Sequence, residues 1–191
     1  MKNTKELPQS LQEKLKEQTE KKWYALYVSS RKEKVVQKRL SEEGYEVYLP
    51  LKKEMHQWKD RKKMVDMPLI PSYVFPHIQK SDIYKVVRMP DCMRFIYFEK
   101  EPASIPDCQI ESMKILLSSD FEIKVNNALS LKKGDKVKIL EGQFAGACGT
   151  IKNKGNKNTF AVTIDALSID LTVTIESSML KVQKINQEEI E

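Results

Sequence analysis

Two stretches of the sequence decide the fold: PLIPSYVF at residues 68–75 and LKKGDKVKILEGQFAGACGTI at residues 131–151. In the second stretch Val137 and Ile139 alternate with lysines, as a half-buried strand requires. Three glycines follow before residue 150 and permit tight backbone reversals. The second stretch therefore predicts short strands joined by tight turns.

The C-terminal third of the chain continues as short predicted strands separated by Gly, Asn and Asp. We expect these strands at residues 137–140, 150–152, 160–164, 171–175 and 180–182. Five short strands at this spacing are typical of a small all-β, SH3-like barrel, here over residues 131–184. The mixed polar residues 118–130 before the barrel are interpreted as a linker, and residues 185–191 as an acidic tail.

Strands and helices alternate in the N-terminal half of the chain. WYALYV at residues 23–28 predicts a strand, and residues 31–43 predict a helix with Val35, Val36 and Leu40 inward. The further predicted elements are strands at 45–49, 68–78 and 93–98, a helix at 81–88, and a helix that opens at Pro106 with Ile110, Met113 and Leu117 along one side. The order βαββαβα predicts an α+β domain over residues 22–117, in which helices pack on a mainly antiparallel sheet. Residues 1–21 are expected to be a disordered or helical extension.

The composition argues against several classes of protein. The net charge of +6 indicates a weak long-range attraction to an acidic partner such as nucleic acid, and the alternative is a solvated basic surface. No stretch approaches the roughly 20 apolar residues of a membrane helix, and the three cysteines lack the spacing of a disulfide framework or a zinc site. His56 and His77 lie on different predicted elements, and no catalytic motif or phosphate loop is present. We therefore expect a monomeric cytoplasmic protein that is not an enzyme and holds neither metal nor cofactor.

A basic stretch at residues 52–63 is expected to form a projecting hairpin or loop. Its basic residues outnumber two acidic ones and are Lys52, Lys53, Lys59, Arg61, Lys62 and Lys63. His56 and Trp58 lie among them, where either ring could stack on an unpaired base. The stretch therefore predicts contact with nucleic acid, and the alternative is a charged loop that binds nothing.

The order of WYALYV, basic helix, PLIPSYVF and the glycine-containing stretch resembles the NusG family of transcription elongation factors, from about residue 22 to residue 184. In that family an NGN domain precedes a barrel with a KOW motif, which residues 131–151 resemble. The resemblance implies a pocket that grips the clamp helices of RNA polymerase, with a partly exposed aromatic ring as its anchor. The matching positions are Trp23, Ile70 and Tyr73, with Phe75 and Ile96 beside or beneath them. From the residues alone, core packing is the alternative for these side chains.

The resemblance also implies contact with DNA of the transcription bubble or with nascent RNA. Because the first helix begins near DNA in the family, Arg31 and Lys32 join the basic stretch as candidate nucleic-acid ligands. The family barrel recruits a ribosomal protein or a termination factor through a loop with an exposed phenylalanine followed by Gly and Arg. Here the loop reads TIDALSID at residues 163–170, and the candidate partner surface is Phe144, Asp165, Leu167 and Ile169.

Two departures from the family pattern suit a specialised paralog. The partner loop lacks the family signature, and Ser72 stands where general members commonly have the glycine of PGYV. Such paralogs promote elongation and antitermination of long operons, often those for surface polysaccharide synthesis. The alternatives are a ribosome-associated RNA-binding protein of the KOW type and a pause-stabilising factor of the same family.

Overall fold

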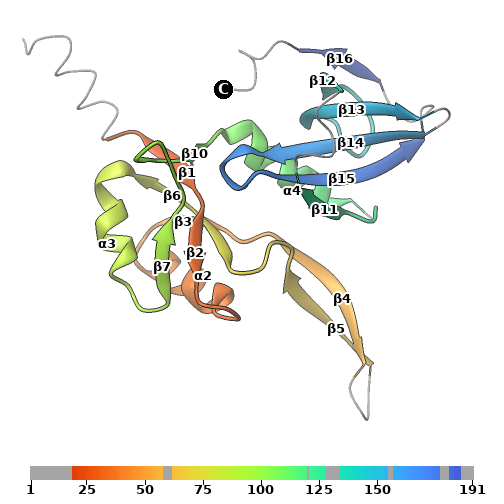
Figure 1. Cartoon of the computed structure of the whole chain (residues 1–191). Helices are drawn as coiled ribbons and strands as arrows, with labels where there is room; N and C mark the ends of the chain where they lie inside the picture. Colours follow the sequence, from red (N-terminus) through yellow and green to blue (C-terminus); the bar gives the residue numbers. More distant parts are fainter. Residues whose placement is uncertain are drawn as a thin grey trace, which may run out of the picture.

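The computed structural model describes residues 19–57, 62–119, 121–127, 134–154, 157–176 and 181–185. Figure 1 shows an N-terminal part that combines strands and helices, followed by a C-terminal part built from strands. The predicted fold class is confirmed: an α+β domain precedes a small all-β barrel. Residues 1–18, 58–61 and 186–191 lie outside the described residues, and with them most of the predicted extension, the hairpin tip and most of the acidic tail.

The N-terminal sheet has the strand order β10, β1, β6, β2, β7 in the described chain, and β3 also pairs with β6. Its strands are β1 (Lys21–Tyr24), β2 (Leu26–Val28), β3 (Glu46–Tyr48), β6 (Tyr73–Gln79), β7 (Cys92–Phe95) and β10 (Ser104–Ile105). The strand predicted at 23–28 is divided at Ala25, whose carbonyl accepts a hydrogen bond from the Ile96 N–H at 3.0 Å. This division lets β1 pair with β10 while β2 pairs with β7.

One face of the sheet packs against two helices. Leu26 and Val74 lie in a buried cluster with Val36 and Leu40 of α2 (Glu33–Glu42). The same cluster includes side chains of α3 (Ile83–Val87), which follows the short 3-10 helix η1 (Lys80–Asp82). Val35 was predicted to point inward but is 46% exposed. Successive helical residues are rotated by about 100°, so the burial of Val36 and Leu40 turns Val35 outward.

The opposite face of the sheet packs against α4 (Asp107–Ser118). Ile110 and Met113 of this helix are buried as predicted, and Leu117 is half-buried. Pro106 occupies the cap position before the helix rather than the predicted first helical position. The helix therefore covers the aromatic face of the sheet, on which Trp23 and Phe75 lie.

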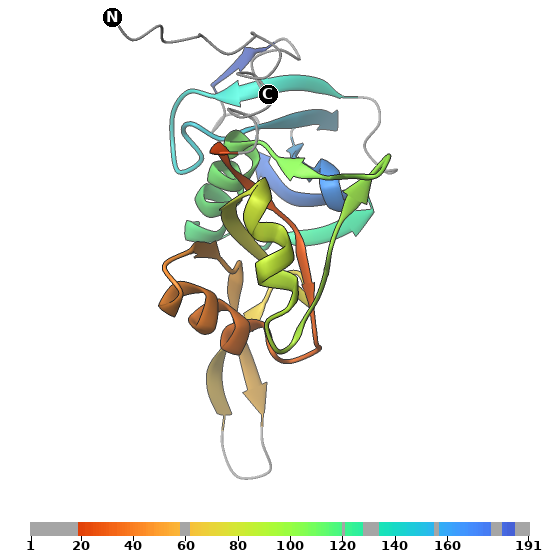
Figure 2. The same cartoon turned by 90° about the vertical axis from the view of Figure 1, so that its left-hand side faces the viewer.

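The basic stretch forms an antiparallel hairpin of β4 (Leu51–Gln57) and β5 (Lys62–Pro68). Figure 1 and Figure 2 both show this hairpin extending away from the rest of the chain, as predicted. A much shorter hairpin of β8 (Tyr97–Phe98) and β9 (Glu101–Pro102) follows β7.

The C-terminal sheet has the order β11, β15, β14, β13, β12, β16 among the described residues. Its strands are β11 (Lys124–Asn127), β12 (Asp135–Ile139), β13 (Cys148–Lys154), β14 (Lys157–Ile164), β15 (Ile169–Glu176) and β16 (Val182–Lys184). Strand β11 falls inside the predicted linker 118–130, so that segment is only in part a connection. It pairs with β15, and the Asn126 side-chain amide donates a hydrogen bond to Thr172 Oγ1 at 2.8 Å.

Helix α4 joins the two domains by packing as well as by chain connection. The Gln109 side-chain amide donates a hydrogen bond to Asp165 Oδ2 at 2.6 Å, and Ser112 Oγ accepts one from the Cys148 N–H at 2.8 Å. A single cluster of buried apolar side chains includes Met113 of the helix together with residues of the sheet and of the barrel. The barrel is thus docked on the same helix that covers the aromatic face of the sheet (Figure 2).

Candidate functional site

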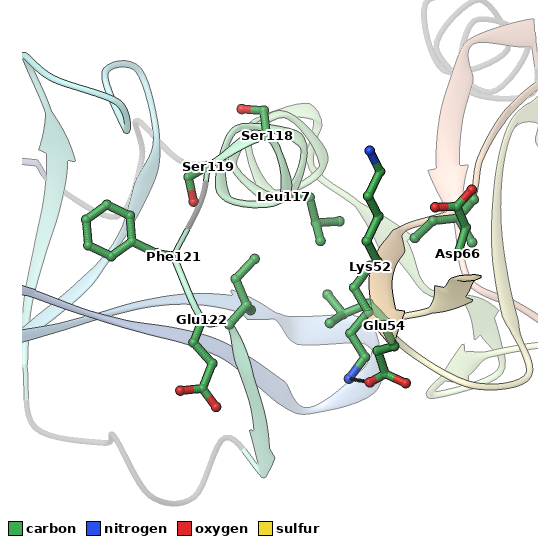
Figure 3. A pocket seen from close by; sticks show the side chains of 12 residues that line it. Lys52, Glu54, Asp66, Leu117, Ser118, Ser119, Phe121 and Glu122 are labelled. Atoms are coloured by element: carbon green, nitrogen blue, oxygen red, sulfur yellow. Dashed lines mark ion pairs between the residues drawn. The ribbon is translucent and has the colours of Figure 1, made fainter. Parts of the chain in front are cut away.

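Two hollows lie where the domains meet. The first, of about 650 Å³, is lined by the base of the β4–β5 hairpin and by the chain around the end of α4, including Lys52, Asp66 and Phe121 (Figure 3). The second, of about 620 Å³, lies between the β8–β9 hairpin and the 3-10 helix η3 (Asp165–Leu167). Ile96 lines the second hollow, whereas Tyr73 lines neither. The five residues predicted for a polymerase pocket are therefore not gathered around one of these two hollows.

Tyr73 begins β6 and is half-buried on the aromatic face of the sheet. It lies directly opposite Tyr27 in the strand register, and the two rings meet edge to face with centroids 5.4 Å apart. The Arg94 guanidinium lies 5.7 Å from the Tyr27 ring centroid and extends this cluster. Tyr73 is therefore held by a neighbouring ring while part of its own surface stays exposed.

The turn before Tyr73 is fixed by a buried carboxylate. Ser72 has a φ of +64°, in the left-handed region that favours glycine. Its N–H donates a hydrogen bond to Glu33 Oε1 at 2.8 Å, and its carbonyl accepts one from the Val28 N–H at 2.9 Å. Glu33 is buried in the first turn of α2, although glutamate is normally a surface residue. The Glu33 carboxylate and the Val28 amide hold the backbone that positions Tyr73.

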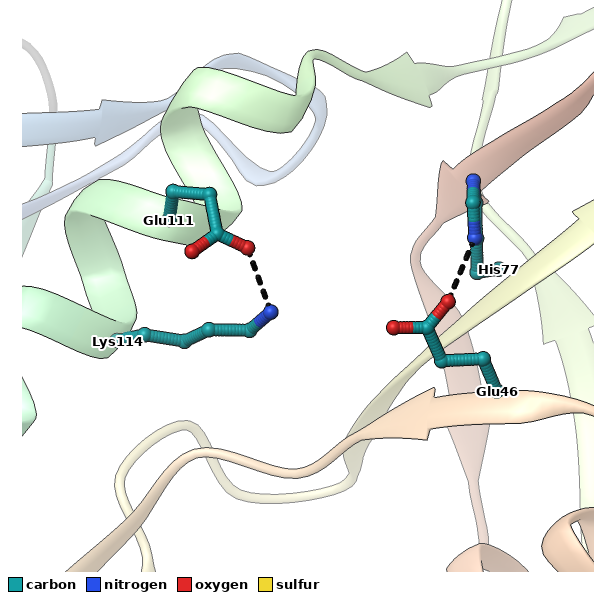
Figure 4. Close-up of polar contacts among 4 residues, drawn as sticks. All are labelled: Glu46, His77, Glu111 and Lys114. Atoms are coloured by element: carbon teal, nitrogen blue, oxygen red, sulfur yellow. Dashed lines mark hydrogen bonds and ion pairs between the residues drawn. The ribbon is translucent and has the colours of Figure 1, made fainter.

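Trp23, Ile70 and Phe75 are buried, in contrast to the partly exposed aromatic anchor that the resemblance implied. Trp23 is only 4% exposed, and its ring stacks on the His77 ring, with centroids 4.7 Å apart and planes 13° apart. His77 Nδ1 in turn lies 2.9 Å from Glu46 Oε2 (Figure 4). Of the five predicted polymerase-binding residues, Tyr73 and Ile96 retain partial exposure, and the other three lie beneath the surface.

Lys114 of α4 packs against the aromatic face of the sheet. Its ammonium lies 5.4 Å from the Trp23 ring centroid and 5.6 Å from that of Tyr48, and it pairs with Glu111 at 2.6 Å (Figure 4). Burial raises the pKa of the Tyr48 hydroxyl, and the nearby Glu111 carboxylate raises it further. Tyr48 therefore stays protonated and acts as a packing surface for the lysine.

The predicted partner surface of the barrel is engaged within the chain. Phe144 is a core residue whose ring tilts against Phe121 with centroids 5.1 Å apart. Asp165 accepts the hydrogen bond from Gln109, and its own N–H lies 3.3 Å from Gln109 Oε1. Leu167 and Ile169 are half-buried against the cluster that spans both domains. These residues thus lie at or near the contact with α4.

The candidate nucleic-acid ligands lie on two separate elements. Arg31 and Lys32 are exposed immediately before α2, and Arg31 has a φ of +64°. On the hairpin, Lys52 pairs with Glu54, whereas Lys53, Lys62 and Lys63 are exposed. His56 belongs to β4, and Trp58, Lys59 and Arg61 lie outside the described residues. Within the described ranges, no group of His, Cys, Asp and Glu side chains could hold a metal ion, and no helix is long and apolar enough to span a membrane.

The sequence and this geometry agree with a comparison to known families. The model of the NusG family, described as transcription termination factor nusG, matches residues 21–114. This range contains every strand of the N-terminal sheet together with most of α4. Residues 21–114 therefore form a domain of the NusG family.

Two solved structures are similar to this chain. Thermotoga maritima NusG, described for its domain interaction, is 24% identical, with 87% of this chain and 98% of that chain covered and a TM-score of 0.47. A chain of the MjSpt4:Spt5 complex in conformation A is 17% identical, with coverages of 86% and 99% and a TM-score of 0.26. No curated protein matches the sequence.

Several residues that shape the NusG-family domain were not found from the sequence. Tyr27 and Lys114 contact the aromatic face through the fold, and neither contact follows from sequence spacing. Glu33 stood out only as an acidic residue in a basic helix. Gln109 gave no signal, because its partner Asp165 lies 56 positions away in the barrel.

Proposed function

We propose that this NusG-family transcription factor binds the clamp helices of RNA polymerase with the surface around Tyr73 and promotes processive elongation and antitermination. The family match supports the general role in transcription elongation. The clamp contact, the nucleic-acid contact and the target operon extend that role to particular residues of this chain.

The observation that carries the proposal is the partial exposure of a well-positioned Tyr73. Its neighbours Tyr27 and Ser72 restrict its movement, so the ring would lose little conformational entropy on binding. Truncation of such an aromatic anchor typically costs about 2 kcal/mol or more of binding free energy. Trp23, Ile70 and Phe75 would support the surface from beneath, and Ile96 would extend it.

The basic residues supply a second contact, with DNA of the transcription bubble or with nascent RNA. Arg31 and Lys32 are exposed at the start of α2, and exposed lysines follow the β4–β5 hairpin. Lysine and arginine bind phosphates chiefly by releasing counterions, so this contact weakens steeply as salt rises. It would stabilise the complex on the template without forming or breaking any bond.

The barrel surface around Asp165 is proposed to bind a protein partner, such as a ribosomal protein. Because Asp165 already accepts a hydrogen bond from Gln109, such a partner would compete with α4 for this surface. Leu167 and Ile169 would become available to the partner only if the barrel moved away from the cluster that they join.

The two departures from the family pattern support a specialised paralog that serves one long operon, such as one for surface polysaccharide synthesis. At residue 72 the backbone keeps the conformation that favours glycine, and the Glu33 hydrogen bond stabilises it with serine in place. The loop at residues 163–170 contains a 3-10 helix that faces α4 instead of an exposed phenylalanine.

Purified core RNA polymerase and single-round transcription test the proposal. We expect the protein to bind the polymerase and to increase read-through of both a pause site and a terminator. Longer pausing would instead identify a pause-stabilising factor. Failure to bind polymerase, together with comigration with ribosomal subunits in high salt, would reject the proposal in favour of a ribosome-associated protein.

A further inference from the structure

The β4–β5 hairpin is a regular two-stranded ribbon that extends beyond both domains (Figure 1). Its antiparallel register runs without a bulge from the pair Leu51 and Pro68 to the pair Gln57 and Lys62. Because successive side chains of a strand point to opposite faces, the ribbon has two distinct faces.

One face presents an exposed set of mixed chemistry, which we name the Met55 face. Its exposed residues are Lys53, Met55 and Gln57 from β4 and Lys62, Met64 and Asp66 from β5. Met55 and Met64 lie directly opposite each other and are 65% and 51% exposed. These two adjacent methionines at the outer half of a projecting ribbon belong to neither buried cluster, so their side chains are available to a partner.

The other face of the ribbon also carries an exposed lysine, Lys63, but the remaining side chains described on it are less available. Lys52 is ion-paired with Glu54, and Glu54 lies opposite the half-buried Val65. Met67 on this face is 36% exposed and lies opposite Lys52 near the base of the hairpin. The difference between the faces selects the Met55 face as the binding surface.

The charge of the ribbon favours a polyanion. The described strands carry four lysines and two carboxylates, and one carboxylate, Glu54, is already paired with Lys52. The other carboxylate, Asp66, lies opposite Lys53 near the base of the hairpin. The outer half of the Met55 face therefore carries a net positive charge, which Lys62 supplies. An acidic partner is therefore favoured, and a nucleic acid is the acidic partner that the proposed function already places here.

The side chains of the Met55 face match the edges of bases in a major groove. Lysine can donate to guanine O6 and N7, the glutamine amide can pair with adenine N6 and N7, and an apolar side chain can contact the thymine methyl group. A two-stranded ribbon fits the major groove of B-form DNA, which is about 12 Å wide. The major groove of an A-form RNA duplex is too narrow and deep for side chains to reach its bases.

We propose that the hairpin lies in the major groove of duplex DNA, with the Met55 face toward the bases. The inference rests on the proposed function for the presence of nucleic acid, and goes further by naming a B-form duplex and a groove. Met55 and Met64 contact thymine methyl groups, Gln57 reads an adjacent base, Lys53 contacts guanine, and Lys62 contacts a backbone phosphate.

Fluorescence anisotropy with the full chain tests this assignment, using a duplex of about 20 base pairs, or two helical turns, at low salt. The same sequence as single-stranded DNA and as duplex RNA provides the comparison. We expect duplex DNA to bind at least tenfold more tightly than either. Replacement of thymine by uracil, which removes the C5 methyl group, and methylation of guanine N7 should each weaken binding.

Variants separate the two faces. Met55→Ser combined with Met64→Ser should weaken binding to duplex DNA by about tenfold, as expected for lost base contacts. Met67→Ser, on the opposite face, should leave it unchanged, and circular dichroism should show all variants folded. Lys62→Gln should reduce the slope of log affinity against log salt by about 0.9, the contribution of one phosphate contact.

Equal or tighter binding to single-stranded DNA or duplex RNA would overturn the duplex assignment, and no binding to any of the three would overturn the inference altogether. An equal effect of Met67→Ser, or insensitivity to both base modifications, would overturn the assignment of face and groove. Polymerase binding without nucleic acid is measured separately. A protein that binds duplex DNA but not polymerase would count against the proposed function alone. A protein that binds polymerase but not duplex DNA would count against this inference alone.

Discussion

The hydrogen bond between Gln109 and Asp165 predicts a measurable energetic coupling between the two domains. Gln109 is buried on α4, its amide donates to Asp165 Oδ2 at 2.6 Å, and Asp165 lies in the barrel. Gln109→Ala, Asp165→Ala and the double variant form a cycle that isolates this one contact. Alanine suits position 109 because it favours helix, and Asp165 can be solvated when its partner is removed.

The magnitude follows from the chemistry of the pair. A hydrogen bond to a charged group contributes about 1.5–3 kcal/mol, and the exposure of Asp165 places this one near the lower limit, at about 1.5 kcal/mol. The second contact, from the Asp165 N–H at 3.3 Å, involves the backbone and survives in Asp165→Ala, so the cycle does not count it.

Urea denaturation of the full chain, followed by circular dichroism, supplies the four free energies of unfolding. We expect a coupling of about 1.5 kcal/mol, with the double variant less destabilised than the sum of the single variants. Lys100→Ala with Asp135→Ala, two exposed positions in different domains, serves as a control cycle with no expected coupling. A coupling indistinguishable from zero for Gln109 and Asp165 would refute the docking of the barrel on α4.

Three further predictions concern stability and pH. Val36→Ala should lower the free energy of unfolding by about 2 kcal/mol in urea denaturation, whereas the same change at exposed Val35 should have little effect; equal effects would contradict the assigned helix face. Gly149→Ala should lower the free energy of unfolding by about 3 kcal/mol or more, because a Cβ at this position would meet the Ala161 carbonyl. NMR should therefore show an unfolded barrel, and a native spectrum would disprove this packing. Burial raises the pKa of the Cys108 thiol to about 11, so alkylation of this thiol should be slow near neutral pH and accelerate toward pH 11. Because the thiol of the unfolded chain loses its proton first, the contribution of Cys108 to stability should fall as pH rises above 9.0. Fast alkylation near neutral pH would argue against burial.

Much of the fold could be predicted because the decisive patterns are local. The alternation around Val137 and Ile139 produced β12, and the spacing of Ile110 and Met113 produced the buried side of α4. These patterns depend on the period of a strand or a helix, which neighbouring residues reveal. The basic stretch likewise formed a hairpin because its strands pair within a short distance along the chain.

The parts that were not predicted depend on contacts between distant residues. Strand β11 has a polar sequence, KVNN, and becomes a strand only because the edge of β15 accepts it. Val35 was predicted inward because apolar character alone does not fix the rotation of a helix. The burial of Trp23 depends on His77 and Lys114, which reach it from another strand and from α4. Which parts of the aromatic face remain exposed is therefore a property of the docked domains.

The central claim is that Tyr73 contacts RNA polymerase, and a matched pair of tyrosine variants tests it most directly. Tyr84 on α3 is 67% exposed and packs against Arg88, away from the aromatic face, so Tyr84→Ala controls for the loss of an exposed ring. The affinity of core polymerase for each variant is measured after equal thermal stability has been established. We predict that Tyr73→Ala weakens binding by about thirtyfold or more, corresponding to about 2 kcal/mol, while Tyr84→Ala binds like the wild type. Equal affinity of the two variants would contradict the claim.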